Sequence, residues 1–250
     1  MSLYNVLKKP YHRLLPYSVR RYIYRISPKP LKNLKGHIIR SLEKSAKHDE
    51  IYDEHYYMET FMKCEPDKGR SCSKIAESIV QTFNPKTVVD VGCGTGFLLA
   101  ALEKSGVHCL GLEYSEAAIN ICRHRGLNVI KFDLEHDVLP EDLEADVVTS
   151  AEVAEHLPAT CADHFIDILC AISKNVVLTA AQPSPLSNAT PDHVNEQPKE
   201  YWINKFKAHG FEYNEALSRK LSADWKASNV VPWYVENLMV LHNTSGNLDQ

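Results

Sequence analysis

The sequence predicts one α/β domain with a mostly parallel sheet, preceded by a basic helical arm. Branched apolar residues around an acid at 88–91 suggest a buried strand, and glycines at 92, 94 and 96 then precede good helix formers from 97 to 104. A second apolar segment, 107–113, ends in an acid, and strand-like and helical segments alternate after it. With 250 residues and 44% hydrophobic content, the chain can bury one such core plus an appendage.

The later elements follow from apolar periodicity and from the residues that end each segment. Apolar spacing at 75, 79 and 83 predicts a helix before the first strand. Further helices are predicted at 115–125 and from 198 to about 209, each followed by a glycine. The remaining predicted strands are 128–132, 145–150, 175–181, 211–213 and 235–241.

The glycine loop suits a nucleotide cofactor, because glycines let a backbone turn sharply and approach a ligand closely. It does not fit the dinucleotide pattern G-x-G-x-x-G, since Phe97 stands at the last position. The form D-x-G-x-G-x-G, from Asp90 to Gly96, resembles the first motif of class I S-adenosylmethionine-dependent methyltransferases. That resemblance implies S-adenosylmethionine as cofactor and a Rossmann-like, seven-stranded, mostly parallel sheet with an antiparallel last strand.

Acids at two later strand ends agree with this cofactor. Glu113 lies at the interval expected of a carboxylate that holds ribose hydroxyls, and in methyltransferases that this chain resembles an acid at Asp133 accepts from the adenine amino group. The alternative for both is a solvated carboxylate at a strand end. The predicted cofactor contacts are Asp90, Gly92, Cys93, Gly94, Gly96, Glu113, Tyr114, Asp133, Leu134, Ser150 and Tyr57.

The segment after the fourth strand carries the most informative chemistry. Glu152, Glu155 and His156 are spaced i, i+3 and i+4, which would place them on one face of a helical turn, and His193 follows the fifth strand at the same edge of the sheet. Two carboxylates and two imidazoles can hold Mg²⁺ or Mn²⁺. Two alternatives stay open: His156 or His193 acts as a base without a metal, or these residues are structural.

The E-x-x-E-H pattern with a later histidine resembles metal-dependent methyltransferases. Among them are ubiquinone-biosynthesis O-methyltransferases and small-RNA 3′-terminal 2′-O-methyltransferases, which methylate one oxygen of a vicinal pair. Methyl transfer from a sulfonium is an in-line displacement, and an alcohol acceptor must lose its proton, whereas an amine needs neither a metal nor a strong base. The sequence therefore favours O-methylation.

The predicted acceptor is a hydroxyl of a small molecule, or of a glycan or lipid-linked intermediate. Part of this prediction is a resemblance of residues 193–202 to methyltransferases of bacterial polysaccharide and secondary-metabolite pathways. Three alternatives are a metal-dependent RNA 2′-O-methyltransferase, a binding module that holds S-adenosylmethionine without catalysis, and, more remotely, a nicotinamide dehydrogenase.

The first part of the chain is strongly basic, although the formal net charge of the whole is −4. Twelve Lys and Arg residues precede Asp49, against the single acid Glu43, and two segments there have helical apolar spacing. Such an arm can pack on the domain or on a second subunit as a homodimer, lie on an anionic membrane surface, or bind nucleic acid. The acidic remainder disfavours nucleic acid.

Seven cysteines, with no C-x-x-C pair, indicate reduced thiols in a cytoplasmic protein. No apolar run approaches the length of a membrane span, which predicts a soluble protein with at most peripheral membrane contact. The predicted organisation is an arm at 1–50, a methyltransferase domain at 51–242 and a disordered tail at 243–250.

Overall fold

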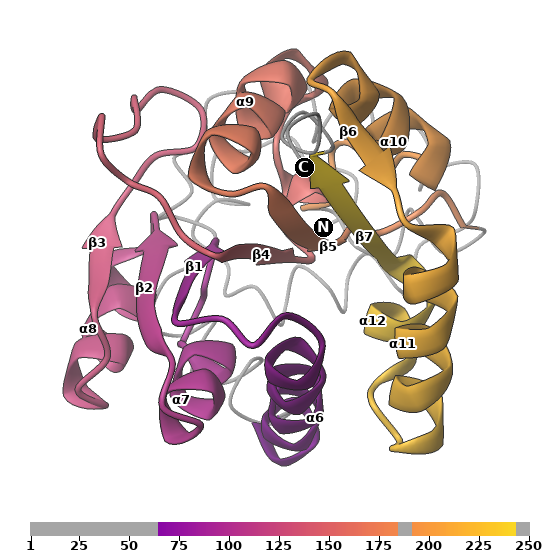
Figure 1. Ribbon diagram of the computed structural model, residues 1–250. Coiled ribbons are helices and arrows are strands. Elements are labelled where there is room, and N and C mark those ends of the chain that lie inside the picture. Colours follow the sequence, from indigo (N-terminus) through magenta and orange to yellow (C-terminus); the bar gives the residue numbers. More distant parts are fainter. Residues whose placement is uncertain (1–64, 185–191, 244–250) are drawn as a thin grey trace, which may run out of the picture.

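The computed structural model describes residues 65–184 and 192–243, and in this part of the chain seven strands form one sheet (Figure 1). The strand order is β3-β2-β1-β4-β5-β7-β6, and β7 runs antiparallel to both neighbours while the other pairings are parallel. The predicted mostly parallel sheet with an antiparallel last strand is confirmed. The strands are β1 (Thr87–Val91), β2 (His108–Glu113), β3 (Val129–Lys131), β4 (Val147–Ala151), β5 (Asn175–Thr179), β6 (Phe211–Tyr213) and β7 (Leu238–Asn243).

Helices cover both faces of this sheet (Figure 1). On β1, Val88 belongs to one apolar cluster and Val89 and Val91 to the other, because successive side chains of a strand point to opposite faces. The sheet thus separates two cores. One face carries α6 (Glu65–Phe83), α7 (Phe97–Lys104), α8 (Glu116–His124), α11 (Glu215–Ala227) and α12 (Pro232–Asn237), and the other carries α9 (Ala162–Ile172) and α10 (Lys199–Ala208).

The last strand begins later than predicted. Residues 232–237 form α12, with Pro232 in its first turn, where the missing N–H of proline costs nothing. The strand therefore starts at Leu238 rather than at residue 235. Helices α9 and α11 were not predicted from the sequence; α11 begins after Asn214, whose Oδ1 accepts a hydrogen bond from Leu217 N at 3.0 Å.

The carboxyl ends of β1, β2 and β4 lie at one edge of the sheet, since Asp90 pairs with Gly111 on one side and with Thr149 on the other. In open α/β sheets this is the edge where ligands bind. The predicted arm, Tyr57 and residues 244–250 of the predicted tail lie outside the described residues. The predicted start of the tail at residue 243 is wrong, because Asn243 is the last residue of β7. None of the helices described here combines the length and the apolar character needed to cross a bilayer.

Candidate functional site

The loop between β1 and α7 depends on its glycines. Gly92, Gly94 and Gly96 have φ values of 74°, 54° and 77°, in the left-handed region that other residues rarely adopt. A Cβ at Gly92 would lie 2.5 Å from Val153 Cγ2, and one at Gly96 would lie 2.4 Å from Leu127 Cδ1. Since Val153 belongs to the segment after β4, the glycine loop is in direct contact with that segment.

Cys93 packs within this loop. Its Sγ lies 3.8 Å from the Gly94 carbonyl oxygen, and Cys122 Sγ lies 3.2 Å from the same oxygen. The Cys122 thiol and burial together raise the pKa of Cys93 well above its usual range. Cys93 is buried in the apolar cluster that the loop borders, and its predicted contact with the cofactor stays a prediction.

The Glu113 carboxylate joins the end of β2 to the glycine loop. Its Oε2 accepts a hydrogen bond from Gly94 N at 2.8 Å and its Oε1 accepts one from Ser115 N at 2.8 Å. Charge-assisted bonds of this kind are stronger than neutral ones, so they hold the carboxylate firmly at the ligand edge. Its role toward ribose hydroxyls stays a prediction.

Asp133 lies beyond β3, at the same edge of the sheet. One of its oxygens accepts from Glu135 N at 2.9 Å, and the other lies 3.0 Å from Nδ1 of His136. Leu134 beside it is buried. The predicted contact of Asp133 and Leu134 with adenine stays a prediction.

Ser150 and Tyr114 complete the predicted cofactor contacts in the described residues. Ser150 is fully buried on β4, and its Oγ donates to the Val91 carbonyl oxygen at 2.8 Å, which ties β4 to β1. Tyr114 follows Glu113 directly, and Lys131 Nζ lies 5.4 Å from the centroid of its ring. Both residues lie at strand ends that border the glycine loop.

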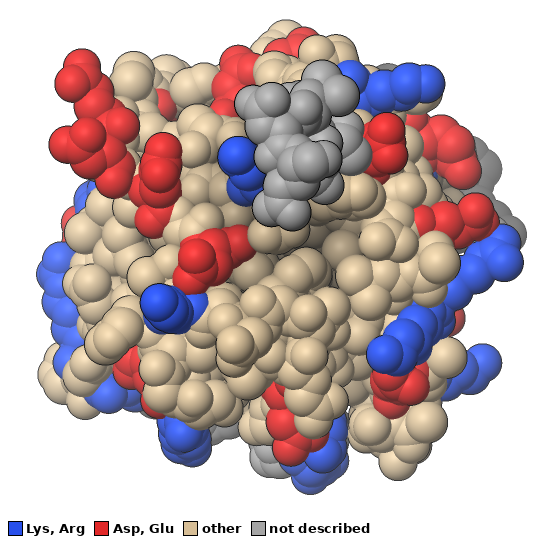
Figure 2. Space-filling view, viewed as in Figure 1, with Lys and Arg blue, Asp and Glu red and all other residues tan. Residues whose placement is uncertain are grey.

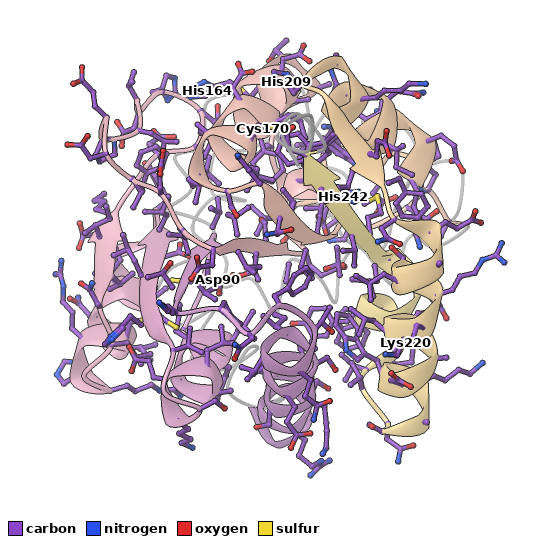
Figure 3. The ribbon with its side chains drawn as sticks, in the orientation of Figure 1. Asp90, His164, Cys170, His209, Lys220 and His242 are labelled. Atoms are coloured by element: carbon purple, nitrogen blue, oxygen red, sulfur yellow. The ribbon has the colours of Figure 1, made fainter. Side chains whose placement is uncertain are left out.

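Asp90 is a buried carboxyl group on β1 (Figure 3). Its Oδ1 accepts a hydrogen bond from Thr149 Oγ1 at 2.6 Å. Burial raises the pKa of Asp90 to about 7; the Thr149 hydrogen bond lowers this pKa and the charge of Glu113 raises it. A carboxyl group with a pKa near neutrality loses its proton readily when a cation approaches, which suits the positively charged end of a ligand.

The segment after β4 departs from its predicted shape. Only Ala154–His156 forms a short 3-10 helix, η4, and Glu152 precedes it with a left-handed φ of 56°. The predicted helical face for Glu152 is therefore wrong. The reason is that Glu152 N donates to Thr179 O at 3.0 Å and to Thr179 Oγ1 at 3.2 Å, which ties this residue to the end of β5.

Glu155 is the most deeply buried acid of the site. It is 0% exposed, and its carboxylate oxygens make no well-formed hydrogen bond in the described residues; their polar neighbours are the Glu152 carboxyl group and backbone groups of Glu155 and Ala181. Burial, followed by the charge of Glu152, raises the pKa of Glu155 well above its usual range. A buried carboxyl group with so little hydrogen bonding is costly, and each such group in a native protein calls for an explanation such as an absent ion.

Two histidines face Glu155. His156 Nδ1 donates to the Asp192 carbonyl oxygen at 3.2 Å, and His193 Nδ1 lies 2.7 Å from Glu196 Oε1. A carbonyl oxygen or a carboxylate at Nδ1 leaves the lone pair on Nε2, which is the arrangement usual for metal-ligating histidines. The two rings meet edge to face with centroids 4.7 Å apart.

These three side chains form one cluster. The ligand atoms of Glu155, His156 and His193 all lie within 4.8 Å of one another. The loop that carries His193 is docked on the cluster, because Val194 N and Asn195 N donate to the Glu155 carbonyl oxygen at 2.8 and 2.9 Å. Glu152 is not part of this three-residue cluster, although the sequence predicts it as a ligand.

Sequence reasoning gave no role to several residues that support the site. Asp192 and Glu196, which contact the two histidines, are close to His193 in the chain, so acids around a loop histidine were an available signal. Asn237 is different. Its Nδ2 donates to Glu152 Oε1 at 3.1 Å across a separation of 85 residues, and no local pattern predicts that contact.

The fold and the site define a doubly wound α/β protein with a nucleotide loop and a polar cluster at one sheet edge. Comparison with known proteins agrees. Residues 58–216 match the model of a methyltransferase-domain family, and the chain belongs to this family of class I S-adenosylmethionine-dependent methyltransferases. The predicted family membership and fold class are confirmed.

Curated relatives match only part of the chain. It is 37% identical over 79 residues to the ubiquinone biosynthesis O-methyltransferase of Hahella chejuensis, a match that covers 29% of this chain and 33% of that protein. The corresponding Methylococcus capsulatus protein is 39% identical over 79 residues, with the same coverage of both chains. The match thus spans about a third of the length of these relatives.

Solved structures support the fold. One is a complex of the Haloferax volcanii Trm112 methyltransferase activator with a methyltransferase, with a TM-score of 0.57, 15% identity and coverage of 76% of this chain and 96% of that chain. Another is magnesium protoporphyrin IX methyltransferase from Synechocystis PCC 6803 with bound SAH, with a TM-score of 0.51, 19% identity and coverage of 64% and 88%. At these identities the likeness concerns the fold alone.

Proposed function

We propose that this protein transfers the methyl group of S-adenosylmethionine to a hydroxyl of a small molecule, or of a glycan or lipid-linked intermediate. The acceptor would be activated at the cluster of Glu155, His156 and His193. One observation carries the proposal: a fully buried carboxylate that makes no well-formed hydrogen bond in the described residues lies beside two imidazoles. A hydroxyl acceptor needs such a group, because it must lose a proton to become a good nucleophile.

The donor set fits a divalent cation. One carboxylate and two imidazoles, with Nδ1 of each ring directed at an oxygen, suit Mn²⁺ better than Mg²⁺, which prefers oxygen ligands alone. A bound cation would supply Lewis-acid chemistry that lowers the pKa of the acceptor hydroxyl. Glu155 would neutralise part of the cation's charge, and Asp192 and Glu196 would keep both rings oriented.

A second candidate mechanism has support of its own. His193 Nδ1 lies 2.7 Å from Glu196 Oε1, so the carboxylate would orient the ring and stabilise its charged form if Nε2 took the proton of the acceptor. This arrangement needs no metal. The glycine loop and Glu113 would hold the cofactor in the same way in either case.

The RNA alternative has weaker support. Exposed acidic residues gather over the β3–β4 connection, where Figure 2 shows a group of Asp and Glu side chains at the upper left. This surface repels phosphates, so RNA would depend on the basic residues before Asp49. Contact of that basic segment with a membrane surface or a second subunit also stays a proposal.

Methyl transfer into a host extract tests the function. With labelled S-adenosylmethionine we expect label in the small-molecule or lipid fraction, its loss with EDTA, and its return with Mn²⁺ more than with Mg²⁺. S-adenosylhomocysteine as competitor controls for non-enzymatic labelling. Label that is indifferent to EDTA but lost in His193→Ala would make His193 the base. Label in a product that RNase degrades would establish the RNA alternative. Binding of S-adenosylmethionine without transfer of any label would leave a binding module.

The Asp90 carboxyl group predicts a pH dependence of cofactor binding. With its pKa raised to about 7, Asp90 is protonated in the free protein at pH 5.5. A cofactor with a cationic amino group favours the ionised form, so binding releases a proton and affinity rises with pH up to about 7, by at most about tenfold per unit.

Calorimetric titration with S-adenosylhomocysteine from pH 5.5 to 7.2 checks this prediction. The range stays below the ordinary α-amino pKa of about 7.7–8.0, so the ligand keeps its charge. Asp90→Asn should flatten the dependence, because an amide does not titrate. An equally steep dependence in Asp90→Asn would assign the proton to another group.

A further inference from the structure

Glu152 is held in an unfavourable backbone conformation. Its φ of 56° is in the left-handed region, which for a residue with a side chain is strained. The surrounding structure enforces it through the two bonds from Glu152 N to Thr179 at the end of β5. Strain of this kind persists only where other contacts determine the position, and it gathers at functional sites.

The side chain of Glu152 is fixed by a residue from a distant part of the chain. Asn237 Nδ2 donates to Glu152 Oε1 at 3.1 Å and to Oε2 at 3.3 Å. Asn237 is the last residue of α12 and is buried directly before β7, the strand that pairs with β5. One amide group thus contacts both oxygens of the carboxylate.

The amide of Asn237 is itself oriented. Gln182 Nε2 donates to Asn237 Oδ1 at 3.2 Å, and because an N–H can only donate, Oδ1 must face Gln182 and Nδ2 must face Glu152. The connection therefore runs from Gln182 through Asn237 to Glu152. Glu152 in turn lies close enough to Glu155 for the two carboxyl groups to affect each other.

We propose that Asn237 is a positioning residue of the acceptor site, which holds the Glu152 carboxylate beside the Glu155, His156 and His193 cluster so that it serves the same divalent cation. This inference rests on the proposed function. The arrangement explains why Glu152 keeps a strained backbone and why its carboxylate has a dedicated donor. Outer-shell partners of metal ligands commonly change metal affinity by about 10–100-fold when they are removed.

A double-mutant cycle tests the proposal with Mn²⁺ alone as the probe. Asn237→Leu keeps the size of the side chain and removes the donor, and we expect it to weaken Mn²⁺ binding by about 10–100-fold, measured by electron paramagnetic resonance. Glu152→Gln should weaken it at least as much. The double variant should bind Mn²⁺ as Glu152→Gln does, within about twofold, because Asn237 acts through Glu152.

Two measurements separate positioning from general damage. S-adenosylhomocysteine affinity should be unchanged in Asn237→Leu, since the cofactor loop is not part of this connection. Asn175→Leu is the matched control: Asn175 Nδ2 donates to the Asp146 carbonyl oxygen at 3.0 Å at the opposite end of β5, and this variant should keep the wild-type Mn²⁺ affinity. If Asn237→Leu does not fold, Gln182→Leu, which frees the amide of Asn237, should weaken Mn²⁺ binding in the same direction and by less.

The outcomes are distinct. Additive losses in the double variant, or wild-type Mn²⁺ affinity in Asn237→Leu, would overturn the positioning role while the metal site itself stands. Wild-type protein that binds no Mn²⁺ but still transfers methyl groups would overturn the metal site, and the positioning role with it.

Discussion

Replacing Glu155 by glutamine is expected to stabilise the metal-free protein and to abolish methyl transfer. Glu155 is 0% exposed, its carboxylate oxygens make no well-formed hydrogen bond in the described residues, and its nearest charged neighbour is another carboxyl group, that of Glu152. At pH 7.5 the folded protein must either bury this charge or take up a proton. Each unit by which folding raises the pKa of Glu155, up to pH 7.5, lowers the free energy of unfolding by about 1.4 kcal/mol. Glutamine has the same shape, carries no charge and takes up no proton, so it avoids this cost.

The increase in stability should be visible in the melting temperature, which rises by about 2–4 °C for each kcal/mol added to the free energy of unfolding in a domain of this size. Methyl transfer should fall by about 100-fold or more, because the variant loses a ligand or an activating carboxylate. Scanning calorimetry in EDTA measures the first effect and the labelled-transfer assay the second. A stabilised but inactive variant is the signature of a residue kept for function at the expense of stability.

Glu113→Gln is the matched control, because Glu113 is also buried but both of its oxygens accept backbone N–H bonds. Glutamine there would turn one acceptor into a donor that faces an N–H, so this variant should lower the melting temperature. Adding Mn²⁺ should then raise the melting temperature of wild-type protein and not that of Glu155→Gln. A lower melting temperature for Glu155→Gln in EDTA would contradict our reading of its environment.

The sheet could be predicted from the sequence because its signals are local. Alternation of apolar residues and the glycines after β1 identified the strands, and the chain order of strands and helices then fixed a parallel sheet. The error at the start of the last strand arose because local signals were misleading there. Residues 232–237 are apolar enough to continue a strand, and only the packed structure shows that Pro232 begins a helix there.

The candidate site was predictable in part, because some of its contacts follow from short sequence separation and from the order of the strands. His156 and Glu155 are neighbours in sequence, and His193 follows the next strand at the same sheet edge, so topology alone brings them together. The orientation of Glu152 was not predictable, since its left-handed backbone depends on Thr179 and its carboxylate on Asn237, both of which are distant in sequence. A spacing of i, i+3 and i+4 assumes a helix that the sheet contact prevents.

Gly92→Ala is expected to damage both the cofactor loop and the acceptor cluster. A Cβ at Gly92 would lie 2.5 Å from Cγ2 and 3.0 Å from Cγ1 of Val153, and the φ of 74° disfavours any side chain. Val153 is branched at Cβ, so it cannot turn aside without moving the backbone between Glu152 and η4. Left-handed strain costs about 1–2 kcal/mol and the added methyl group about 1–3 kcal/mol more.

Two other glycines separate these contributions. Gly106 has a similar φ of 82°, and no atom lies within 4 Å of a Cβ added there. Gly106→Ala should therefore lose only the stability that left-handed backbone strain costs, without the steric cost of the methyl group. The Cβ of Gly96→Ala would lie 2.4 Å from Leu127 Cδ1 and 2.9 Å from Sγ of Cys122, a residue of α8. It should weaken S-adenosylhomocysteine binding and leave Mn²⁺ binding intact.

Gly92→Ala alone among the three should weaken the binding of both ligands, measured by calorimetry for S-adenosylhomocysteine and by electron paramagnetic resonance for Mn²⁺. That result would show that the absence of a side chain at Gly92 serves both the cofactor loop and the acceptor cluster. Val153 packs where the Cβ of another residue would lie, and this contact sets the start of the turn that carries Glu155 and His156. Normal Mn²⁺ binding in a folded Gly92→Ala protein would mean that the turn adapts to the loop, and that the two sites are mechanically independent.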